Sequence, residues 1–262
     1  MSMTNSTVAS EGVSRDQAAV LACGLDAPVY QALRVASTPN LANALLKRGF
    51  RNTYLTGLKP LSGSQEKLIG PAFTLRFMPS REDINSLQTY ASPDNKHRVA
   101  METCPMGAVL VIDAYGGNTR ASSMGDLMAA RLKARGVAGV VTDGGFRDSE
   151  GIRRTGLAAY QKQGTSPATP IVMHAIDLNV PIGCAGVAIY PGDIMVGDAD
   201  GVVAIPRHLV EEVAFEAKAA EEYEGWALMQ IEHGKSVMGL FPATPESLKE
   251  YEQWIAAGRP QI

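Results

Sequence analysis

The spacing of apolar and polar residues predicts a chain that mixes helices with strands. Ser37-Thr38-Pro39 is a helix start signal, and the apolar residues after it recur with helical spacing until Gly49. Residues 67–78 alternate apolar and polar positions, which favours a strand. The unbroken apolar run at 108–112 is typical of a strand buried on both faces. The first half of the chain is therefore expected to build an α/β core.

The second half of the chain changes its pattern twice. Short apolar segments separated by glycine and aspartate turns indicate a strand at 171–174 and hairpin-like β structure at 180–205. Beyond Arg207, helical spacing returns in a long acidic segment, and Thr244-Pro245 begins a last short helix. Residues 79–96 are polar and show no readable period. The chain thus predicts a β-rich second half followed by a helical extension.

Residues 125–148 carry the strongest functional signal. This stretch reads as a glycine turn, an amphipathic helix, a buried strand and a loop. A helix N-terminus presents unpaired backbone N–H groups and partial positive charge, which suits a carboxylate. The loop after the strand carries Asp143, Arg147 and Asp148, at the end of the strand where ligands are usually met. One half-site for an anion and one for a cation are expected to converge here.

Composition narrows the class of protein. The 262 residues are 45% apolar, enough for one domain with appendages. The formal net charge is −3 and the basic residues are spread throughout, so no nucleic-acid surface is expected. Three cysteines without a CxxC pattern favour neither a disulfide framework nor a thiolate zinc site. With no convincing signal peptide and no apolar run of membrane-spanning length, we expect a cytoplasmic protein without membrane contact.

Asp126 is followed after twenty residues by Arg147-Asp148, and this spacing has two interpretations. A hard divalent cation prefers carboxylate oxygens and water, and an adjacent guanidinium can bind an oxygen of a substrate held on that cation. Alternatively, Asp126 caps a helix while Arg147 and Asp148 form a surface ion pair. The physical pattern alone leaves both interpretations open, and the glycines beside these residues favour a ligand site.

Several motifs in this region resemble the RraA-like family, named for the regulator of ribonuclease activity A. The motifs are Gly125-Asp126-Leu127, Gly136-Val137-Ala138-Gly139 and Asp143-Gly144-Gly145-Phe146-Arg147-Asp148. Residues 192–193 and 198–203 resemble the family's final hairpin, and the similarity covers roughly residues 33–213. It is greatest to the branch of 4-hydroxy-4-methyl-2-oxoglutarate and 4-carboxy-4-hydroxy-2-oxoadipate aldolases, whose hallmark is the same Asp, twenty residues, Arg-Asp.

The resemblance implies an α/β fold of the layered α-β-β swivelling-domain type, with a C-terminal helical extension. On this basis we expect a flexible N-terminal tail at 1–25, an RraA-like catalytic domain at 26–210 and a helical extension at 211–262. It also implies a homo-oligomer, either a trimer or a hexamer built as a dimer of trimers.

The activity implied is that of a class II, metal-dependent pyruvate aldolase. Such an enzyme cleaves a 4-hydroxy-2-oxo acid to pyruvate and a second oxo acid, and oxaloacetate decarboxylation passes through the same pyruvate enolate. By resemblance, Asp148 would hold Mg²⁺ or Mn²⁺, Arg147 would bind the 2-oxo oxygen, and Asp126 would complete the metal's polar shell. The backbone of Gly125, Asp126, Leu127 and Met128 would receive the pyruvate carboxylate. An acid from a neighbouring subunit assists in this family, and the candidates here are Glu221, Glu222 and Glu224.

Two other functions compete with the aldolase. Members that regulate ribonuclease E or a helicase are non-catalytic and lack the acidic-Arg-Asp set, whereas this chain retains Asp126, Arg147 and Asp148. A phosphohistidine swivelling domain would need a reactive histidine in a glycine-rich loop, and none of the four histidines lies in one. The aldolase is therefore the function we expect.

Overall fold

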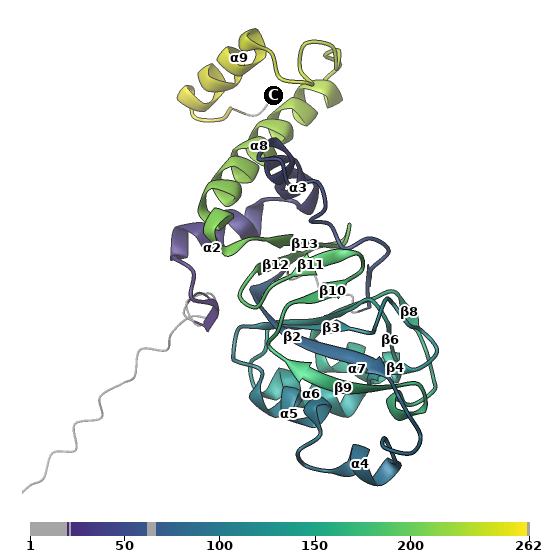
Figure 1. Cartoon of the computed structure of the whole chain (residues 1–262). Helices are drawn as coiled ribbons and strands as arrows, with labels where there is room; N and C mark the ends of the chain where they lie inside the picture. Colours follow the sequence, from purple (N-terminus) through teal and green to yellow (C-terminus); the bar gives the residue numbers. More distant parts are fainter. Residues whose placement is uncertain (1–19, 21, 62–66, 261–262) are drawn as a thin grey trace, which may run out of the picture.

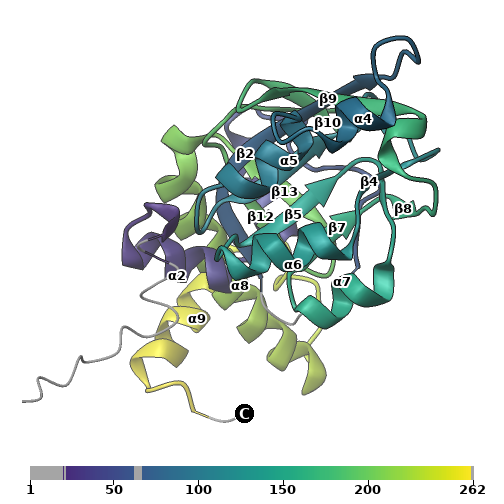
Figure 2. The same cartoon turned by 90° about the horizontal axis from the view of Figure 1, so that it is seen from below.

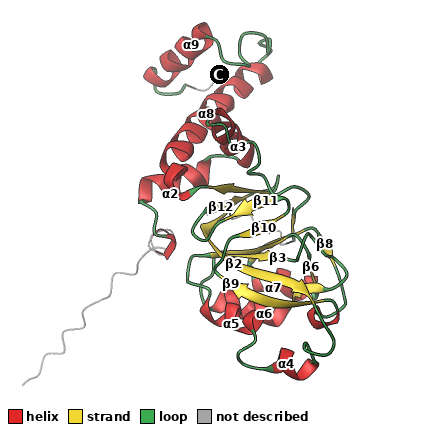
Figure 3. Cartoon of the chain, viewed as in Figure 1, coloured by secondary structure: helices red, strands yellow, loops and turns green. Residues whose placement is uncertain are grey.

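The structure, a computed structural model, describes residues 20, 22–61 and 67–260. It is a mixed α/β fold in which a curled sheet lies between two groups of helices (Figure 1). Figure 3 shows the strands gathered in the middle of the molecule and the helices on either side and at the C-terminal end. The layered α/β class expected from the sequence is thus confirmed, and so is the helical C-terminal region. None of the helices in the described part combines the length and apolar content needed to cross a membrane.

The main sheet has eight strands in the order β1-β7-β5-β3-β2-β12-β13, with β9 also paired to β2. Its strands are β1 (Lys59–Pro60), β2 (Leu68–Pro79), β3 (Val109–Asp113), β5 (Gly139–Thr142), β7 (Ala158–Gln161), β9 (Met173–Leu178), β12 (Ile194–Gly197) and β13 (Val202–Ile205). Strands β2, β3, β5 and β7 are parallel neighbours. The 12-residue β2 pairs with β12 along its first part and with β9 along its last part, and this division lets the sheet curl.

One face of the sheet is covered by α5 (Lys96–Thr103), α6 (Asp126–Ala134) and α7 (Ser149–Thr155). Figure 2, which is seen from below, shows these three helices in front of the strands. Their apolar side chains, among them Met101, Leu132 and Ile152, bury against Leu110 and Ile112 of β3. This packing fixes the N-terminal ends of α6 and α7 relative to the sheet, and those ends carry the residues of interest.

The inside of the curl forms a second core. It is closed by the hairpin β10 (Ile182–Cys184) and β11 (Val187–Ile189), which is antiparallel. Val109 and Val111 of β3 point to this side, whereas Leu110 and Ile112 point to the helices. Because every residue of β3 is buried, the strand has no polar face, as its unbroken apolar run predicts.

The remaining helices cover the outer strands of the sheet, and the C-terminal ones extend beyond it. Helices α2 (Ala27–Val35), α3 (Thr38–Lys47) and the first half of α8 (Val210–Glu232) pack on β12 and β13. The second half of α8 projects away from the sheet (Figure 1). There Tyr251 and Trp254 of α9 (Pro245–Ala256) pack against a separate cluster of Tyr223, Trp226, Ala227 and Leu240. A capping box of Thr244 and Ser247 begins α9.

Several elements differ from the expectation. The predicted strand at 171–174 is displaced, because Pro170 lies in the 3₁₀ turn η1 (Thr169–Ile171) and β9 begins only at Met173. The polar stretch 79–96 contains the short helix α4 (Leu87–Ala91). Strand β7 and helix α2 were not predicted, and a second 3₁₀ turn, η2 (Arg207–Leu209), precedes α8. Residues 1–19 and 21 of the predicted N-terminal tail lie outside the described residues.

Candidate functional site

A small parallel sheet brings the two halves of the Asp, Arg-Asp motif together. It contains β4 (Ser122–Met124), β6 (Gly145–Phe146) and β8 (Gln163–Gly164). Strand β4 runs into α6 and strand β6 runs towards α7, so the two form adjacent βα units. The backbone N–H of Arg147 donates to the carbonyl of Met124 at 3.0 Å. Because parallel strands end at the same edge, residues with twenty others between them in the sequence meet there.

The residues predicted for the site line one cavity of about 380 Å³. Gly125, Asp126, Leu127, Met128, Arg147 and Asp148 are all among its walls. The cavity is bounded in addition by residues that the sequence did not indicate: Tyr90, His97, Arg98, Met101, Glu102, Ser122, Met124, Arg131, Ala168 and Thr169. The helix start and the Arg-Asp loop therefore face a common space, as the sequence predicted.

Two glycines allow the polar groups to lie this close. A Cβ on Gly125 would sit 2.7 Å from Oδ2 of Asp148 and 3.1 Å from Nε of Arg147. A Cβ on Gly151, in α7, would clash with the carboxylate of Asp126. Contacts of this kind require a residue without a side chain. The Asp148 carboxylate thus lies against the bare backbone at the start of α6.

Arg147 and Asp148 do form an ion pair, with Nε and Oδ2 3.2 Å apart, and both side chains remain nearly half exposed. Asp148 adopts a left-handed backbone conformation with φ of 56°, which is uncommon for a residue other than glycine. Although it occupies the position before α7, its side chain makes no capping hydrogen bond. The carboxylate is consequently available to the cavity, and the ion-pair interpretation and the ligand-site interpretation describe the same arrangement.

The donor set fits a hard divalent cation that keeps much of its water. Asp148 and Asp126 contribute carboxylate oxygens to one cavity, and Mg²⁺ is typically held by one or two carboxylates together with water and substrate oxygens. Across the described residues, no group of three or more His, Cys, Asp or Glu side chains is assembled as a closed metal site. The chemistry therefore suits Mg²⁺ or Mn²⁺ at Asp148 better than a structural zinc ion.

Helix α5 supplies a wall of the cavity that sequence reasoning missed. His97 is 1% exposed, and its ring lies close to the Ser123 backbone without a hydrogen bond of normal geometry at either ring nitrogen in the described structure. Its ring packs edge-on against Phe77 at 5.2 Å. Burial lowers the pKa of His97 to about 4, against a smaller opposing effect of the Ser123 backbone. The charge of Arg98 acts in the same direction as burial, so the imidazole is neutral at pH 7. The only signal in the sequence was the helical spacing of His97 and Met101, which alone indicates a buried face.

Other residues considered from the sequence lie elsewhere. Asp143 is buried and accepts hydrogen bonds from the backbone of Ala114 at 2.8 Å and Ala185 at 3.2 Å, so it holds two loops together outside the cavity. This corrects the expectation that it shares a half-site with Arg147. Glu221 and Glu224 accept from the Asn40 amide, both at 2.9 Å, and tie α8 to α3 within one chain.

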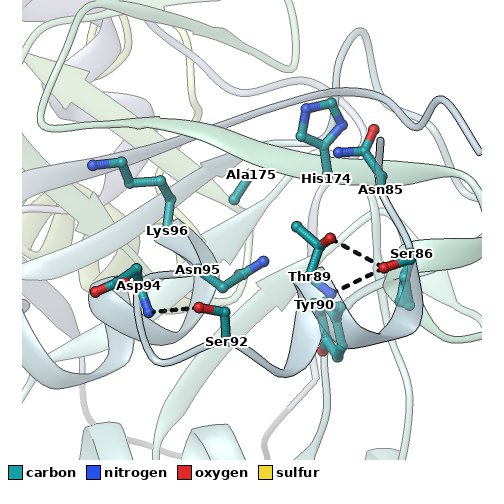
Figure 4. A pocket seen from close by; sticks show the side chains of 11 residues that line it. Asn85, Ser86, Thr89, Tyr90, Ser92, Asp94, Asn95, Lys96, His174 and Ala175 are labelled. Atoms are coloured by element: carbon teal, nitrogen blue, oxygen red, sulfur yellow. Dashed lines mark hydrogen bonds between the residues drawn. The ribbon is translucent and has the colours of Figure 1, made fainter. Parts of the chain in front are cut away.

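A second cavity, of about 240 Å³, lies next to the first and shares Tyr90 with it. Figure 4 shows its polar side chains, which come from α4 and the loops on either side of it, the start of α5 and β9. Several of them are engaged with their own neighbours, since the Ser86 hydroxyl pairs with Thr89 and the Ser92 hydroxyl accepts from the Asp94 backbone. It has no counterpart to the arrangement of Asp126, Arg147 and Asp148.

Comparison with known proteins assigns the chain to a family. The profile of the RraA-like family, described as Aldolase/RraA, matches residues 38–204 and thus includes the whole Asp126 to Asp148 motif. The chain belongs to the RraA-like family. This RraA-like protein is 38% identical over 162 residues to a Halalkalibacterium halodurans protein named "Putative 4-hydroxy-4-methyl-2-oxoglutarate aldolase". That match spans 62% of this chain and 70% of the relative.

Solved structures of similar fold include two that cover most of the RraA-like chain. Streptomyces coelicolor RraAS2, described as an unusual member of the RNase ES inhibitor RraA protein family, is 31% identical with a TM-score of 0.67. The match covers 78% of this chain and 97% of that one. A Pseudomonas syringae protein, 24% identical, has a TM-score of 0.72 over 84% of this chain and 95% of its own, which supports the fold.

Proposed function

We propose that this protein is a carbon-carbon lyase, a divalent-metal-dependent aldolase that cleaves a 4-hydroxy-2-oxo acid to pyruvate and a second oxo acid. The observation that supports it most is the convergence of Asp126, Arg147 and Asp148 on one cavity at the N-terminus of α6. The aldolase name carried by the Halalkalibacterium halodurans relative agrees with this reaction. The 4-hydroxy-4-methyl-2-oxoglutarate type of substrate is the first to test.

In this proposal the walls of the cavity bind the pyruvate half of the substrate. The backbone N–H groups at the start of α6, from Gly125 to Met128, receive its carboxylate, because their partial positive charge and free donors favour an anion. Arg147 binds the 2-oxo oxygen, where negative charge develops as the bond breaks. Asp148 would hold Mg²⁺ or Mn²⁺ beside that oxygen, with Asp126 in its polar surroundings. The metal, when bound, supplies positive charge that stabilises the developing enolate.

The reaction also requires a base for the 4-hydroxyl proton. As that proton leaves, the C3–C4 bond breaks, its electron pair passes to the pyruvate half as an enolate, and protonation at C3 gives pyruvate. Besides Asp148, the carboxylates of the cavity are Asp126 and Glu102. Arg131 engages Glu102 in a close ion pair, at 2.6 Å, whereas Asp126 has no such partner in the described structure. We therefore propose Asp126 as the base. Oxaloacetate decarboxylation, which forms the same enolate, is expected as a side reaction.

The family's other known role gives the alternative, a non-catalytic regulator that binds ribonuclease E or a helicase. The description of the Streptomyces coelicolor relative points in that direction for that protein. A docking surface would not need carboxylates and an arginine gathered in a cavity beside a helix N-terminus, so we favour the enzyme. We also propose that the protein is a homo-oligomer, a trimer or hexamer, as its family membership suggests.

Pyruvate release tests the proposal directly. It should be measured from 4-hydroxy-4-methyl-2-oxoglutarate and from oxaloacetate, with Mg²⁺ and with a chelator. We expect metal-dependent release that falls by roughly 100-fold or more in Arg147→Gln and Asp148→Asn, because each removes a charge that stabilises the transition state. Asp83→Asn is the matched control, since Asp83 forms an exposed ion pair with Arg81 outside the cavity. Absence of release with folded, metal-supplied protein would contradict the proposal and favour the regulator.

A further inference from the structure

Three arginines line the cavity, and they differ in how their charge is compensated. Arg147 pairs with Asp148 at 3.2 Å, and Arg131 pairs with Glu102 at 2.6 Å. Arg98, on α5, has no carboxylate partner anywhere in the described part of the chain. The cavity therefore contains one guanidinium whose charge the protein itself leaves uncompensated.

The position of Arg98 is nevertheless fixed. Its Nε donates to the backbone carbonyl of Tyr90 at 3.1 Å, and its guanidinium lies 5.7 Å from the centre of the Tyr90 ring. A guanidinium over an aromatic face is held by a cation–π attraction that does not neutralise it. Since Nε makes the hydrogen bond to Tyr90, the terminal amino groups of Arg98 stay available for a ligand.

The cavity wall formed by α5 is separate from the one expected to bind pyruvate. The proposed pyruvate contacts come from the start of α6 and from Arg147, whereas Tyr90, His97, Arg98 and Glu102 belong to α4 and α5. His97 is neutral at pH 7 and Glu102 is already paired. Of the groups on this wall, Arg98 is thus the one that can compensate a second negative charge on the substrate.

We propose that Arg98 binds the distal carboxylate of a dicarboxylic 2-oxo acid and makes the enzyme selective for such substrates over monocarboxylic ones. This inference rests on the proposed function, because it takes the pyruvate half to occupy the α6 end. Guanidinium and carboxylate match in charge and in planar two-point geometry, so the pair is strong and specific. An uncharged group at that end would gain nothing from Arg98.

Binding measurements test Arg98 without relying on turnover. Titration calorimetry in the presence of Mn²⁺ should compare 2-oxoglutarate, which has two carboxylates, with 2-oxobutyrate, which has one. We expect the wild type to bind 2-oxoglutarate about tenfold tighter or more, and Arg98→Gln to lose this preference while binding 2-oxobutyrate as before. Arg98→Lys should retain part of it. Arg120→Gln is the control, because Arg120 is exposed and lies outside the cavity.

The inference is overturned if the wild type shows no preference, if Arg98→Gln weakens both ligands equally, or if neither ligand binds at millimolar concentration. Cleavage of 4-hydroxy-2-oxoglutarate and 4-hydroxy-2-oxopentanoate separates this result from the proposed function. Selective binding without pyruvate release would refute the aldolase and leave the role of Arg98 intact. Cleavage of both compounds with equal efficiency would support the aldolase and refute the role of Arg98.

Discussion

The carboxylate of Asp126 lies directly against the backbone of Gly151, so that the first residue of α6 contacts the third residue of α7. Any side chain at position 151 would displace Asp126. The start of α6 and the start of α7 are the two segments that carry the proposed site. The distance between the starts of α6 and α7 is thus set by Gly151, which has no side chain.

Gly151→Ala should therefore damage activity rather than stability. Alanine is the better helix former, yet its methyl group would push the Asp126 carboxylate aside, and a displacement of about 1 Å costs roughly 100-fold in rate. We expect this displacement to lower kcat/KM for pyruvate release by roughly 10- to 100-fold. Gly225→Ala in α8 is the control, because its new methyl group would meet nothing within 4 Å. Equal activity of the two variants would contradict this contact.

Metal binding should be visible as a gain in thermal stability. A cation present at about 100 times its dissociation constant stabilises the folded state by about 2.7 kcal/mol, which raises Tm by roughly 5–10 °C for a chain of this size. Differential scanning calorimetry should show this rise with Mn²⁺ for the wild type and for Asp83→Asn. Asp148→Asn should show none. A similar rise in Asp148→Asn would place the metal elsewhere.

Acidification should lower the stability of the folded protein because His97 is buried in its neutral form. In the folded protein the pKa of His97 lies at about 4, against 6.5 when exposed, so below pH 6.5 the unfolded chain binds the proton more readily. The stabilisation is complete above pH 6.5 and is lost as the pH falls towards 4. Between pH 7 and pH 5 the loss amounts to about 2 kcal/mol.

Urea unfolding at pH 7 and pH 5 measures that contribution as a difference between wild type and His97→Gln. The difference is needed because burial raises the pKa of Asp113 to about 6, with the nearby charge of Asp143 acting in the same direction. A carboxyl group with a raised pKa contributes stability in the opposite sense as the pH falls. His208→Gln, at an exposed histidine, should keep the wild-type slope. An unchanged slope in His97→Gln would show that His97 is not buried and neutral.

The packing of α9 against the second half of α8 depends on the Tyr223 hydroxyl. This group donates to the carbonyl of Leu240 at 2.7 Å and lies 2.8 Å from the Ser247 hydroxyl, and it is buried. Tyr223→Phe should reduce the free energy of unfolding by about 1–2 kcal/mol, because buried acceptors lose their donor. Tyr251→Phe, in the same aromatic cluster but without a hydroxyl bond in the described structure, should cost less. Pyruvate release should not change in either variant.

The convergence of Asp126 with Arg147 and Asp148 could be predicted from the sequence because these residues are local to two βα units. Asp126 follows β4 after a single glycine and Arg147 follows β6 directly, so their convergence needs only that β4 and β6 be parallel neighbours. The wall of α5 could not be predicted in the same way. Arg98 and Glu102 lie on a helix whose preceding segment is polar and without a period, and only the fold brings this helix against α6.

The fold was predictable where hydrophobic patterns are long and not where they are short. The buried run of β3 and the start signal of α3 were read correctly. Strand β6 has two residues and β4 has three, which is too few for an apolar period to appear. Pro170 moved the start of β9 because proline at the beginning of a 3₁₀ turn prevents the strand from starting earlier. The pairing of β2 with two different strands along its length is a long-range outcome that no local pattern encodes.

The small sheet that positions the site consists of strands of two or three residues, joined by few backbone hydrogen bonds. Proteins open locally in regions with few such bonds at a lower free energy than they unfold as a whole. The amide protons of β4, β6 and β8 should therefore exchange with solvent earlier than those of β3 and β5. On heating, the geometry of the site would be lost while the curled sheet persists, and inactivation would precede global melting.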